Sequence, residues 1–378
     1  MMRIGFDVSY IQKRCAGLGR YSAELLRALL AADKENEYIL HGWSWSLDKD
    51  MLGLFAQPNV RMKWDRVPGP VKRFYWNVTR VPDIRVFTGA IDIFQSMDPF
   101  LPPSGKNRTV ATVHDLAQLK FPDLFGRSVH RWGRFLGASL GRADAILVPS
   151  ESTARDVAGM LRIPGERIHI VRPPVSPVFR AEASPDADRA VLSRWAVTQP
   201  YALFVGTLEP RKNVPALIAA FERHHARCRS DLHLVIIGRK GWLHGDTMTS
   251  ILTSRLKTRI RHLDFVPDID LAALYRQARC FVYPSLYEGH GSPVAEAMAS
   301  ETPVITSANS SLKEIGEGVA RLVDPGNVDE IADAITDLRN DDAQCRSRAL
   351  AGRERVKRFD HRTCADTLLG LYHSVVPS

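Results

Sequence analysis

Short apolar runs, many of them rich in β-branched residues, recur along the whole chain between longer stretches with a helical spacing of apolar positions. In the first half these runs are RIGFDV, EYILHG, IDIFQS, TVATVHD and DAILVPS, and in the second half YALFVG, LHLVIIG, HLDFVP, CFVYPS and PVITS. Strands that alternate with helices of ten or more residues are typical of parallel, doubly wound sheets. The pattern therefore predicts an α/β protein with two such sheets, which bind ligands beyond the carboxyl ends of their strands.

The stretch VRPPVSPVFR separates the two sets of strands. Its prolines cannot lie inside a sheet, and 378 residues are too many for one ordinary core. We therefore expect one domain at 1–173 and another at 174–359. The tail from about Arg353 to Val376 has an amphipathic helical pattern, and residues from about 360 to 378 are expected to pack back onto the first domain.

Two acids flank a glycine turn in SLYEGHGSPVAEAM, which follows the strand CFVYPS. Glu288 is expected at the carboxyl end of that strand. Gly289 and Gly291 permit unusual backbone dihedrals, and Ser292 followed by Pro293 is a typical N-cap and first turn of a helix. The free amides and the positive dipole end of this helix would form an anion site suited to a diphosphate.

Glu296 lies one turn further into the same helix, where a carboxylate can accept hydrogen bonds from ribose hydroxyls. Glu288 would then face the group attached to the phosphates. The structural alternative makes Glu288 a surface acid and Glu296 a complement to the helix dipole.

A second strand-to-helix junction occurs in FVGTLEPRKNVPALIAAFERH, with Arg211 and Lys212 in the loop and a helix from near Val214. Two adjacent cations at such a junction can neutralise a departing diphosphate without a metal. Taken alone, a solvated Arg-Lys pair is the favoured interpretation. The two junctions together favour a phosphate site.

In combination these motifs resemble the retaining glycosyltransferases of family 4. The family's Glu, seven residues, Glu signature matches Glu288 and Glu296, and E-G-x-G-x-P is followed by E-A-M-A. VGTLEPRKN is similar to the basic donor-phosphate loop, LVPSESTARD to the end of the first domain, and LVDPGNVDEIADAI to the C-terminal helix entry. The resemblance implies the GT-B fold, with two Rossmann-like domains whose parallel sheets face across a cleft.

The resemblance also implies roles for matching residues. Lys212 and Arg211 would contact the donor diphosphate, Glu296 the ribose, and Glu288 the transferred sugar. His114 in VATVHDL would bind a donor-sugar hydroxyl, although without the resemblance His114 and Asp115 would be a satisfied turn pair. The implied donor-binding set also includes Gly17 and Gly19 of CAGLGRYSAELL, Gly289, His290, Gly291, Ser292 and Thr207.

The chain departs from the family at some of these positions. The family usually has an aromatic or aliphatic residue at His290, leucine at Ser292 and often glycine at Glu301. Related enzymes often have arginine where this chain has Thr207, so Arg211 is expected to supply part of that charge.

Other chemistries find weaker support. Asp186-Ala-Asp188 and Asp268-Ile-Asp270 are the Asp-x-Asp candidates for a metal site, and the second is better explained as an N-cap with early helix acids. The five scattered cysteines argue against a zinc site or a disulfide framework. A Ser-His-Asp hydrolase and a dehydrogenase are not expected. We expect no catalytic metal, no cofactor and no nucleic-acid partner.

Net charge is concentrated in the first half. Residues 1–173 hold 25 Lys and Arg against 17 Asp and Glu, so +8 of the total +9 lies there. Residues 61–80 carry six Lys and Arg interleaved with Trp64, Phe74, Tyr75 and Trp76, and residues 126–142 would form a basic amphipathic helix. Both suit an anionic membrane surface, and a solvated loop and an ordinary core-facing helix are equal alternatives.

The predicted function is transfer of a sugar from a nucleotide-diphosphate donor to a saccharide or polyprenyl-diphosphate-linked acceptor, with retention of configuration. By its likeness to mannosyltransferases of bacterial surface polysaccharide assembly, GDP-mannose is the first choice of donor. A UDP-sugar transferase, a nucleotide-sugar epimerase of the same fold and a non-catalytic nucleotide-binding partner of the membrane remain alternatives. No secretory signal or membrane-spanning run is evident, so we expect a cytoplasmic protein, peripheral at the inner membrane face.

Overall fold

The chain forms two compact units. A computed structural model describes residues 1–11, 17–43, 53–65, 67, 71, 75–76, 78–125, 129–182 and 184–376. Unit 1 comprises Met1–Pro174 with Phe359–Ser378, and unit 2 comprises Val175–Arg358. The division falls one residue beyond the boundary predicted from the proline-rich stretch.

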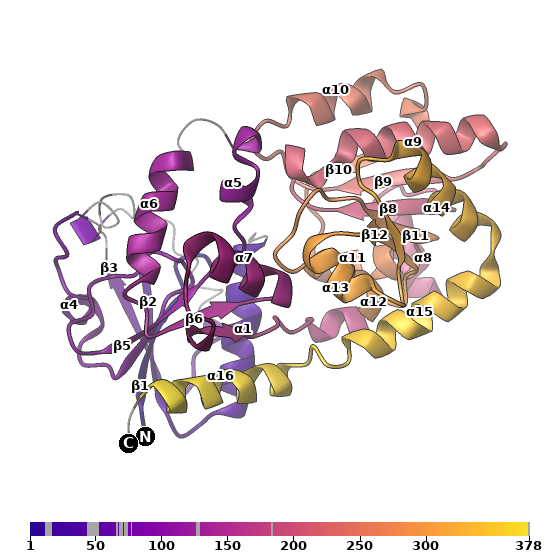
Figure 1. Cartoon of the computed structure of the whole chain (residues 1–378). Coiled ribbons are helices and arrows are strands. Elements are labelled where there is room, and N and C mark those ends of the chain that lie inside the picture. Colours follow the sequence, from indigo (N-terminus) through magenta and orange to yellow (C-terminus); the bar gives the residue numbers. More distant parts are fainter. Residues whose placement is uncertain are drawn as a thin grey trace. The chain divides into compact units, whose positions relative to one another are not determined.

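Unit 1 contains a seven-stranded sheet in the order β3-β2-β1-β4-β5-β6-β7, and all its pairs are parallel (Figure 1). Its strands are β1 (Arg3–Asp7), β2 (Glu37–Trp43), β3 (Val60–Asp65), β4 (Ile93–Gln95), β5 (Arg108–Thr112), β6 (Ala145–Val148) and β7 (Ile168–Ile170). Its helices include α1 (Leu18–Ala32), α4 (Arg85–Thr88), α5 (Ala117–Lys120), α6 (Val129–Leu140), α7 (Glu151–Leu161) and α16 (His361–Val375).

Unit 2 contains a six-stranded parallel sheet in the order β10-β9-β8-β11-β12-β13. Its strands are β8 (Tyr201–Val205), β9 (His233–Ile237), β10 (Ile260–Leu263), β11 (Cys280–Tyr283), β12 (Val304–Ser307) and β13 (Arg321–Val323). Its helices include α8 (Pro185–Arg194), α9 (Val214–Arg227), α10 (Gly245–Thr253), α11 (Asp268–Arg276), α12 (Ser292–Ala299), α13 (Ser310–Gly316), α14 (Val328–Asn340) and α15 (Asp342–Val356). The predicted fold class of two parallel α/β sheets is confirmed.

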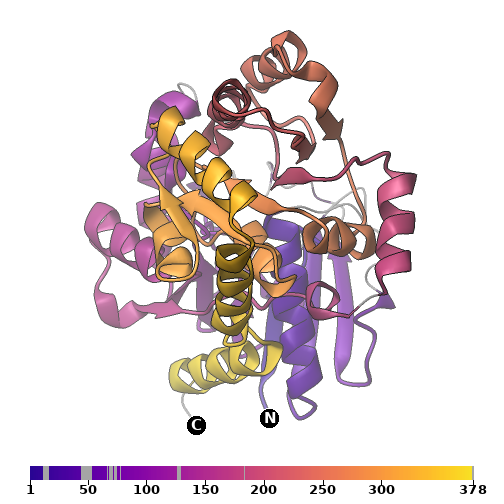
Figure 2. The ribbon, with the colours of Figure 1, turned by 90° about the vertical axis from the view of Figure 1, so that its right-hand side faces the viewer.

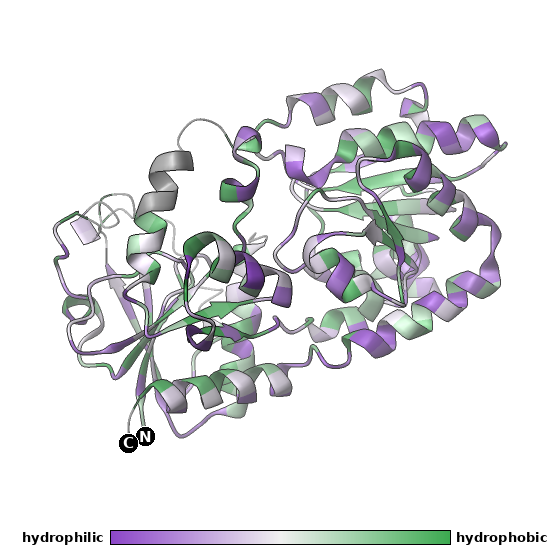
Figure 3. Cartoon of the chain, viewed as in Figure 1, coloured by the Kyte–Doolittle hydropathy of each residue, from purple (hydrophilic) through white to green (hydrophobic). Residues whose placement is uncertain are grey.

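Burial explains why apolar runs located the strands so well. Every residue of β8 and of β11 is buried, as expected for central strands that are covered on both faces. In Figure 3 the strands of both sheets are mainly hydrophobic, whereas the helices carry hydrophilic stripes. The helices thus bury one side against a sheet and present the other to solvent.

The predicted single helix at the C-terminus is in fact two helices, α15 and α16. Asp360 is the N-cap of α16, and its side chain accepts a hydrogen bond from the backbone N–H of Thr363. The second helix therefore starts at this residue. Leu368 and Tyr372 of α16 are fully buried in one apolar cluster with residues of α1. Figure 2 shows α16 beside α1, near the N-terminus of the chain. The tail therefore packs on unit 1.

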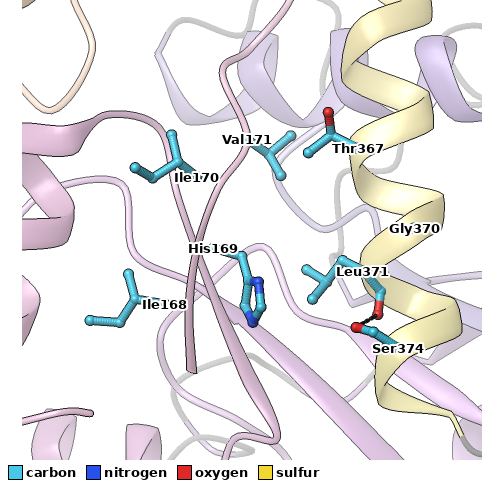
Figure 4. A pocket seen from close by; sticks show the side chains of 8 residues that line it. All are labelled: Ile168, His169, Ile170, Val171, Thr367, Gly370, Leu371 and Ser374. Carbon is cyan, nitrogen blue, oxygen red and sulfur yellow. Dashed lines mark hydrogen bonds between the residues drawn. The ribbon is translucent and has the colours of Figure 1, made fainter. Parts of the chain in front are cut away.

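A cavity of about 420 Å³ lies between β7, the edge strand of the first sheet, and α16 (Figure 4). It is lined mainly by aliphatic side chains, with one imidazole and two hydroxyls: Ile168, His169, Ile170, Val171, Thr367, Gly370, Leu371 and Ser374. The helix therefore packs less tightly against β7 than against α1.

Part of the basic segment at 61–80 is a strand, which the sequence analysis did not predict. Residues 60–65 form β3 at the edge of the sheet. Trp64 is 37% exposed and Tyr75 48% exposed, whereas Trp76 is buried in an apolar cluster. The interpretation as a loop was thus wrong for β3, and only some of the aromatics are available to a surface. Phe74 lies outside the described residues.

The second basic stretch forms the predicted helix, α6. Leu136 and Leu140 are fully buried in the core of unit 1, which favours the core-facing interpretation for that side. Arg127 and the side chains of Val129, Arg131, Trp132 and Arg134 lie outside the described part. Arg142 lies two residues beyond the last residue of α6 and donates a hydrogen bond to the carbonyl of Leu101.

Candidate active site

Two loops meet at the carboxyl ends of β8 and β11, which are hydrogen-bonded neighbours at the centre of the second sheet. The loop after β8 carries Arg211 and Lys212 in a short 3-10 turn, and the loop after β11 carries Glu288. Both loops lead directly into helices, α9 and α12. Parallel neighbouring strands place their carboxyl ends at the same edge, so the two predicted motifs come into contact.

Lys212 and Glu288 form a buried ion pair. Lys212 Nζ lies 2.5 Å from Glu288 Oε1 and 2.8 Å from the hydroxyl of Tyr283. The hydroxyls of Tyr283 and Ser285 also donate to Glu288 Oε1, at 3.1 and 2.6 Å. Each charged partner is only 7% exposed, which excludes the interpretation of Glu288 as a surface acid.

Arg211 is held between two carboxylates. Its Nε and Nη2 lie 3.1 and 2.8 Å from Glu209 Oε1, and its Nη1 lies 2.9 Å from Glu288 Oε2. Nη1 also donates to the carbonyl of Tyr287. Arg211 and Lys212 are therefore not the solvated pair that the sequence favoured when taken alone.

Burial and charge act in opposite directions on these groups. Burial raises the pKa of Glu288, but Arg211, Lys212 and the hydrogen bonds it accepts outweigh burial and lower its pKa to about 2. For Glu209 burial dominates and raises the pKa, although Arg211 and Lys212 oppose it. Burial and Arg211 lower the pKa of Lys212, against the effect of Glu288.

Three members of this cluster were not predicted from the sequence, namely Glu209, Tyr283 and Ser285. Glu209 is 2% exposed, and its position two residues before Arg211 was the available signal. Tyr283 and Ser285 belong to or follow β11, and an apolar run gives no indication that a tyrosine hydroxyl at its end will meet a lysine from another loop.

The helix after Glu288 begins differently from the prediction. Gly291, with φ of 87°, is the N-cap, and Ser292 is the first helical residue. A Cβ at Gly291 would lie 2.7 Å from Leu312 Cδ2, so both the dihedral and the space require glycine. Gly289 is buried and does not take positive φ. Ser292 as N-cap was therefore wrong, while the helix itself is where it was predicted.

Other residues hold the two loops in place. The backbone N–H of Glu288 donates to Ser310 Oγ, and its carbonyl accepts from Ser311 Oγ. Asn213, in the left-handed conformation at the start of α9, donates to the carbonyls of Pro284 and Pro325. Both loops are thus fixed by hydrogen bonds from neighbouring segments.

Glu296, His290 and Thr207 are further predicted donor residues in unit 2. Glu296 is 6% exposed on α12, and its Oε2 lies 3.2 Å from the hydroxyl of Tyr275. His290 and Thr207 are half-buried, in the loops after β11 and β8. A Cβ at Gly241 would approach Thr207 Cγ2 to 2.7 Å, so the segment after β9 packs against the phosphate-loop candidate.

The predicted residues of unit 1 lie at the carboxyl ends of its own sheet. His114 follows β5, and its Nε2 donates to the carbonyl of Met97 at 3.0 Å. Burial lowers the pKa of His114, and its ring packs edge-on against Tyr21. Gly17, with φ of 50°, is the N-cap of α1, and Gly19 lies buried within the helix. Residues 12–16, before this turn, are not described.

One acid of each Asp-x-Asp candidate is held in hydrogen bonds to neighbouring side chains. Asp188 accepts from Arg276 and Gln277, and Asp270 from Arg194 and Trp195. Pro267, not Asp268, is the N-cap of α11. Among the described residues, no group of three His, Cys, Asp or Glu side chains is placed to hold a metal ion.

Two further features of the sequence have structural roles. GASLG at 137–141 has the spacing of a nucleophile elbow, but Ser139 lies in α6, is 1% exposed and accepts from the backbone N–H of Leu101. Cys228, Cys280, Cys345 and Cys364 are free thiols, three of them buried, and Cys15 lies outside the described residues.

Solved structures share this fold over nearly the full chain. Sucrose-phosphate synthase from Thermosynechococcus elongatus matches with a TM-score of 0.78 at 18% identity and covers 99% of both chains. Anabaena HepE, solved in complex with UDP-glucose, matches with a TM-score of 0.77 at 17% identity over 99% of this chain and 100% of that one. These likenesses establish the two-domain fold that the resemblance implied.

Sequence comparisons identify the family. Residues 191–355 match the model "Glycosyl transferases group 1" and residues 16–179 match "Glycosyltransferase Family 4". The O-antigen chain mannosyltransferase B of Escherichia coli is 29% identical over 98% of this chain and 99% of its own length. The chain belongs to the glycosyltransferase family that these models describe, and the prediction of a glycosyltransferase is confirmed.

Proposed function

We propose that this enzyme transfers a mannosyl residue from GDP-mannose to a saccharide or polyprenyl-diphosphate-linked acceptor, with retention of configuration, in the synthesis of a bacterial surface polysaccharide such as O-antigen. The full-length similarity to an O-antigen mannosyltransferase supports the choice of sugar and pathway. The buried cluster of Arg211, Lys212 and Glu288 is the single observation that carries the proposal.

In this proposal the donor diphosphate takes the place of Glu288 as the partner of both cations. Arg211 and Lys212 then stabilise the charge that develops on the leaving diphosphate, in a buried setting where such stabilisation is strongest. Glu288, released from the cations, faces the transferred sugar, and Glu296 accepts from the ribose hydroxyls. The two cations supply the charge that a metal ion supplies in other transferases.

Retention follows when the acceptor attacks the face from which the diphosphate leaves. A diphosphate oxygen takes the proton of the acceptor hydroxyl while the bond from sugar to phosphate breaks. No protein carboxylate is required to form a covalent intermediate. The role of His114, as a contact to a donor-sugar hydroxyl, stays a prediction.

A UDP-sugar is the second candidate donor, since a protein of the same fold was solved with UDP-glucose. Thermal shift against GDP, UDP and ADP and their sugars distinguishes the donors. A nucleotide at about 100 times its Kd should stabilise the fold by about 2.7 kcal/mol. We expect GDP and GDP-mannose to give the largest shift, and a larger shift with UDP would replace GDP-mannose as the donor.

We further propose a cytoplasmic location with peripheral contact to an anionic membrane. Exposed apolar side chains of residues 54–86, such as Tyr75, Val81 and Val86, accompany Arg61 and Lys63 on β3. Within the described ranges, no helix is long and apolar enough to cross a bilayer. Binding to phosphatidylserine vesicles should occur at low salt and weaken as salt increases, and failure to bind at low salt would refute the contact.

A further inference from the structure

Within the part of the chain that the structure describes, the four charged side chains of the donor-site cluster have no net charge. Arg211 and Lys212 contribute two positive charges, and Glu209 and Glu288 contribute two negative ones. None of the four side chains is more than 12% exposed. A nucleotide sugar brings a diphosphate with two further negative charges. Binding it here would leave an uncompensated negative charge in a buried setting, which is unfavourable unless a proton is taken up.

The two carboxylates are engaged differently. Both oxygens of Glu288 accept hydrogen bonds, Oε1 from Lys212, Tyr283 and Ser285 and Oε2 from Arg211. Glu209 receives both of its contacts from Arg211 on one oxygen, Oε1. Among the described residues, none donates a hydrogen bond to Glu209 Oε2. A proton can therefore bind at Oε2 without breaking either contact to Arg211.

We propose that Glu209 is a protonatable counter-ion of the donor-phosphate site, which takes up a proton from solvent on Oε2 when a nucleotide sugar binds. The inference rests on the proposed function, because it places the diphosphate at Arg211 and Lys212. Glu209 keeps Arg211 oriented in both states. It is thus a positioning residue whose charge adjusts to the ligand.

The surroundings of Glu209 favour this role. Burial raises the pKa of its carboxyl, Glu288 raises it further, and Arg211 and Lys212 oppose both. From the loop after β9, Gly241 packs against Glu209, Lys240 is exposed, and Arg239 lies over the ring of Phe265. A bound diphosphate adds negative charge beside the carboxyl, so its pKa rises again.

Proton uptake links donor affinity to pH. Because the complex binds more protons than the free protein, affinity falls as pH rises between the free and bound pKa of Glu209. For one proton the limit is a tenfold loss of affinity for each pH unit. The nucleotide sugar itself does not contribute, since its diphosphate has no group that titrates near neutral pH.

Isothermal titration calorimetry tests the inference. GDP-mannose or UDP-glucose is titrated into the full chain at one pH in two buffers with different ionisation enthalpies, and the difference in observed enthalpy gives the number of protons taken up. When the titration is repeated over the pH range in which the protein stays folded, wild type should take up a substantial fraction of one proton at one or more pH values. Glu209→Gln should take up none and bind with an affinity independent of pH. Glu317→Gln, at an exposed acid of the same unit, is the matched control and should behave as wild type.

Binding without proton uptake by wild type, or unchanged uptake by Glu209→Gln, would overturn the inference and leave the proposed function standing. Failure of wild type to bind either nucleotide sugar would overturn both. If Glu209→Gln does not fold, NMR of wild type labelled with ¹³C at glutamate tests the proposal through the ¹³Cδ resonance of Glu209. It should move in the direction of protonation on addition of the nucleotide sugar, and an unmoved resonance would refute the proposal.

Discussion

Lys212 and Glu288 illustrate how a functional residue depends on its immediate neighbours. Each is a charged side chain that burial would disfavour, and each is retained because the other compensates it. Removing one partner leaves an uncompensated charge inside unit 2, which is costly in a buried pair. The arrangement therefore keeps two cations charged and positioned before a ligand arrives.

The low pKa of Glu288 predicts a loss of stability in acid. Its pKa of about 2 lies below the ordinary 4.5, so its contribution is fully present above about pH 4.5 and is lost as pH falls toward 2. Lys212→Met should destabilise the fold by about 1–3 kcal/mol at neutral pH and move the acid loss to higher pH, because it raises the pKa of Glu288. Urea unfolding from neutral pH to about pH 3 checks this. Parallel pH profiles for the two proteins would contradict it.

Among single residues, those in recognisable sequence motifs were predicted, whereas the side chains that contact them were not. Arg211, Lys212 and Glu288 lie in loops whose glycines, cations and acids stand out from the surrounding pattern. Tyr283 does not stand out, because its importance arises only when the loops after β8 and β11 meet, whereas Glu209 was signalled only by its position two residues before Arg211. Such a contact depends on strand order, which the apolar pattern does not specify.

At the scale of elements, the α12 start fixes the backbone that follows Glu288. Gly291 takes a left-handed conformation with Leu312 packed where a side chain would lie. The helix can therefore begin directly after the loop, so that the positive end of its dipole lies next to the loop that carries Glu288.

Substitution Gly291→Ala should destabilise unit 2 by about 1–3 kcal/mol, since a left-handed alanine is strained and its Cβ would displace Leu312. It should also weaken nucleotide-sugar binding, because the loop after Glu288 shifts. Gly245→Ala, where nothing lies within 4 Å of a new Cβ, should change stability by less than about 0.5 kcal/mol. Thermal unfolding of the three proteins measures the difference, and equal stabilities would disprove the account of this turn.

Most strands could be predicted because they are buried on both faces and appear as continuous apolar runs. The strand β3 was missed because VRMKWD contains no continuous apolar run, although its alternation of apolar and polar residues is typical of a half-buried strand. The three-residue β13 is too short for a pattern, and β10 lies at 260–263 rather than at 262–267. The C-terminal tail appeared continuous because the capping role of Asp360 becomes visible only in three dimensions.

For the whole molecule, the number of sheets, their parallel character and the family were accessible from the sequence. Repetition of strand and helix over 378 residues permits few folds other than two doubly wound sheets. The charge is also a property of the whole, because +8 of the net +9 lies in residues 1–173. The ligand of this basic half depends on its individual side chains and not on the fold.

Turnover of a nucleotide sugar by Lys212→Ala tests whether Arg211 and Lys212 form the donor-phosphate site. With the nucleotide identified by thermal shift, transfer to acceptor is compared among wild type, Lys212→Ala and Lys313→Ala, which alters an exposed lysine of the same unit. We expect a loss of at least about 100-fold in turnover for Lys212→Ala, with the fold retained as judged by circular dichroism, and near-normal turnover for Lys313→Ala. A folded Lys212→Ala enzyme with near-normal turnover would contradict this assignment.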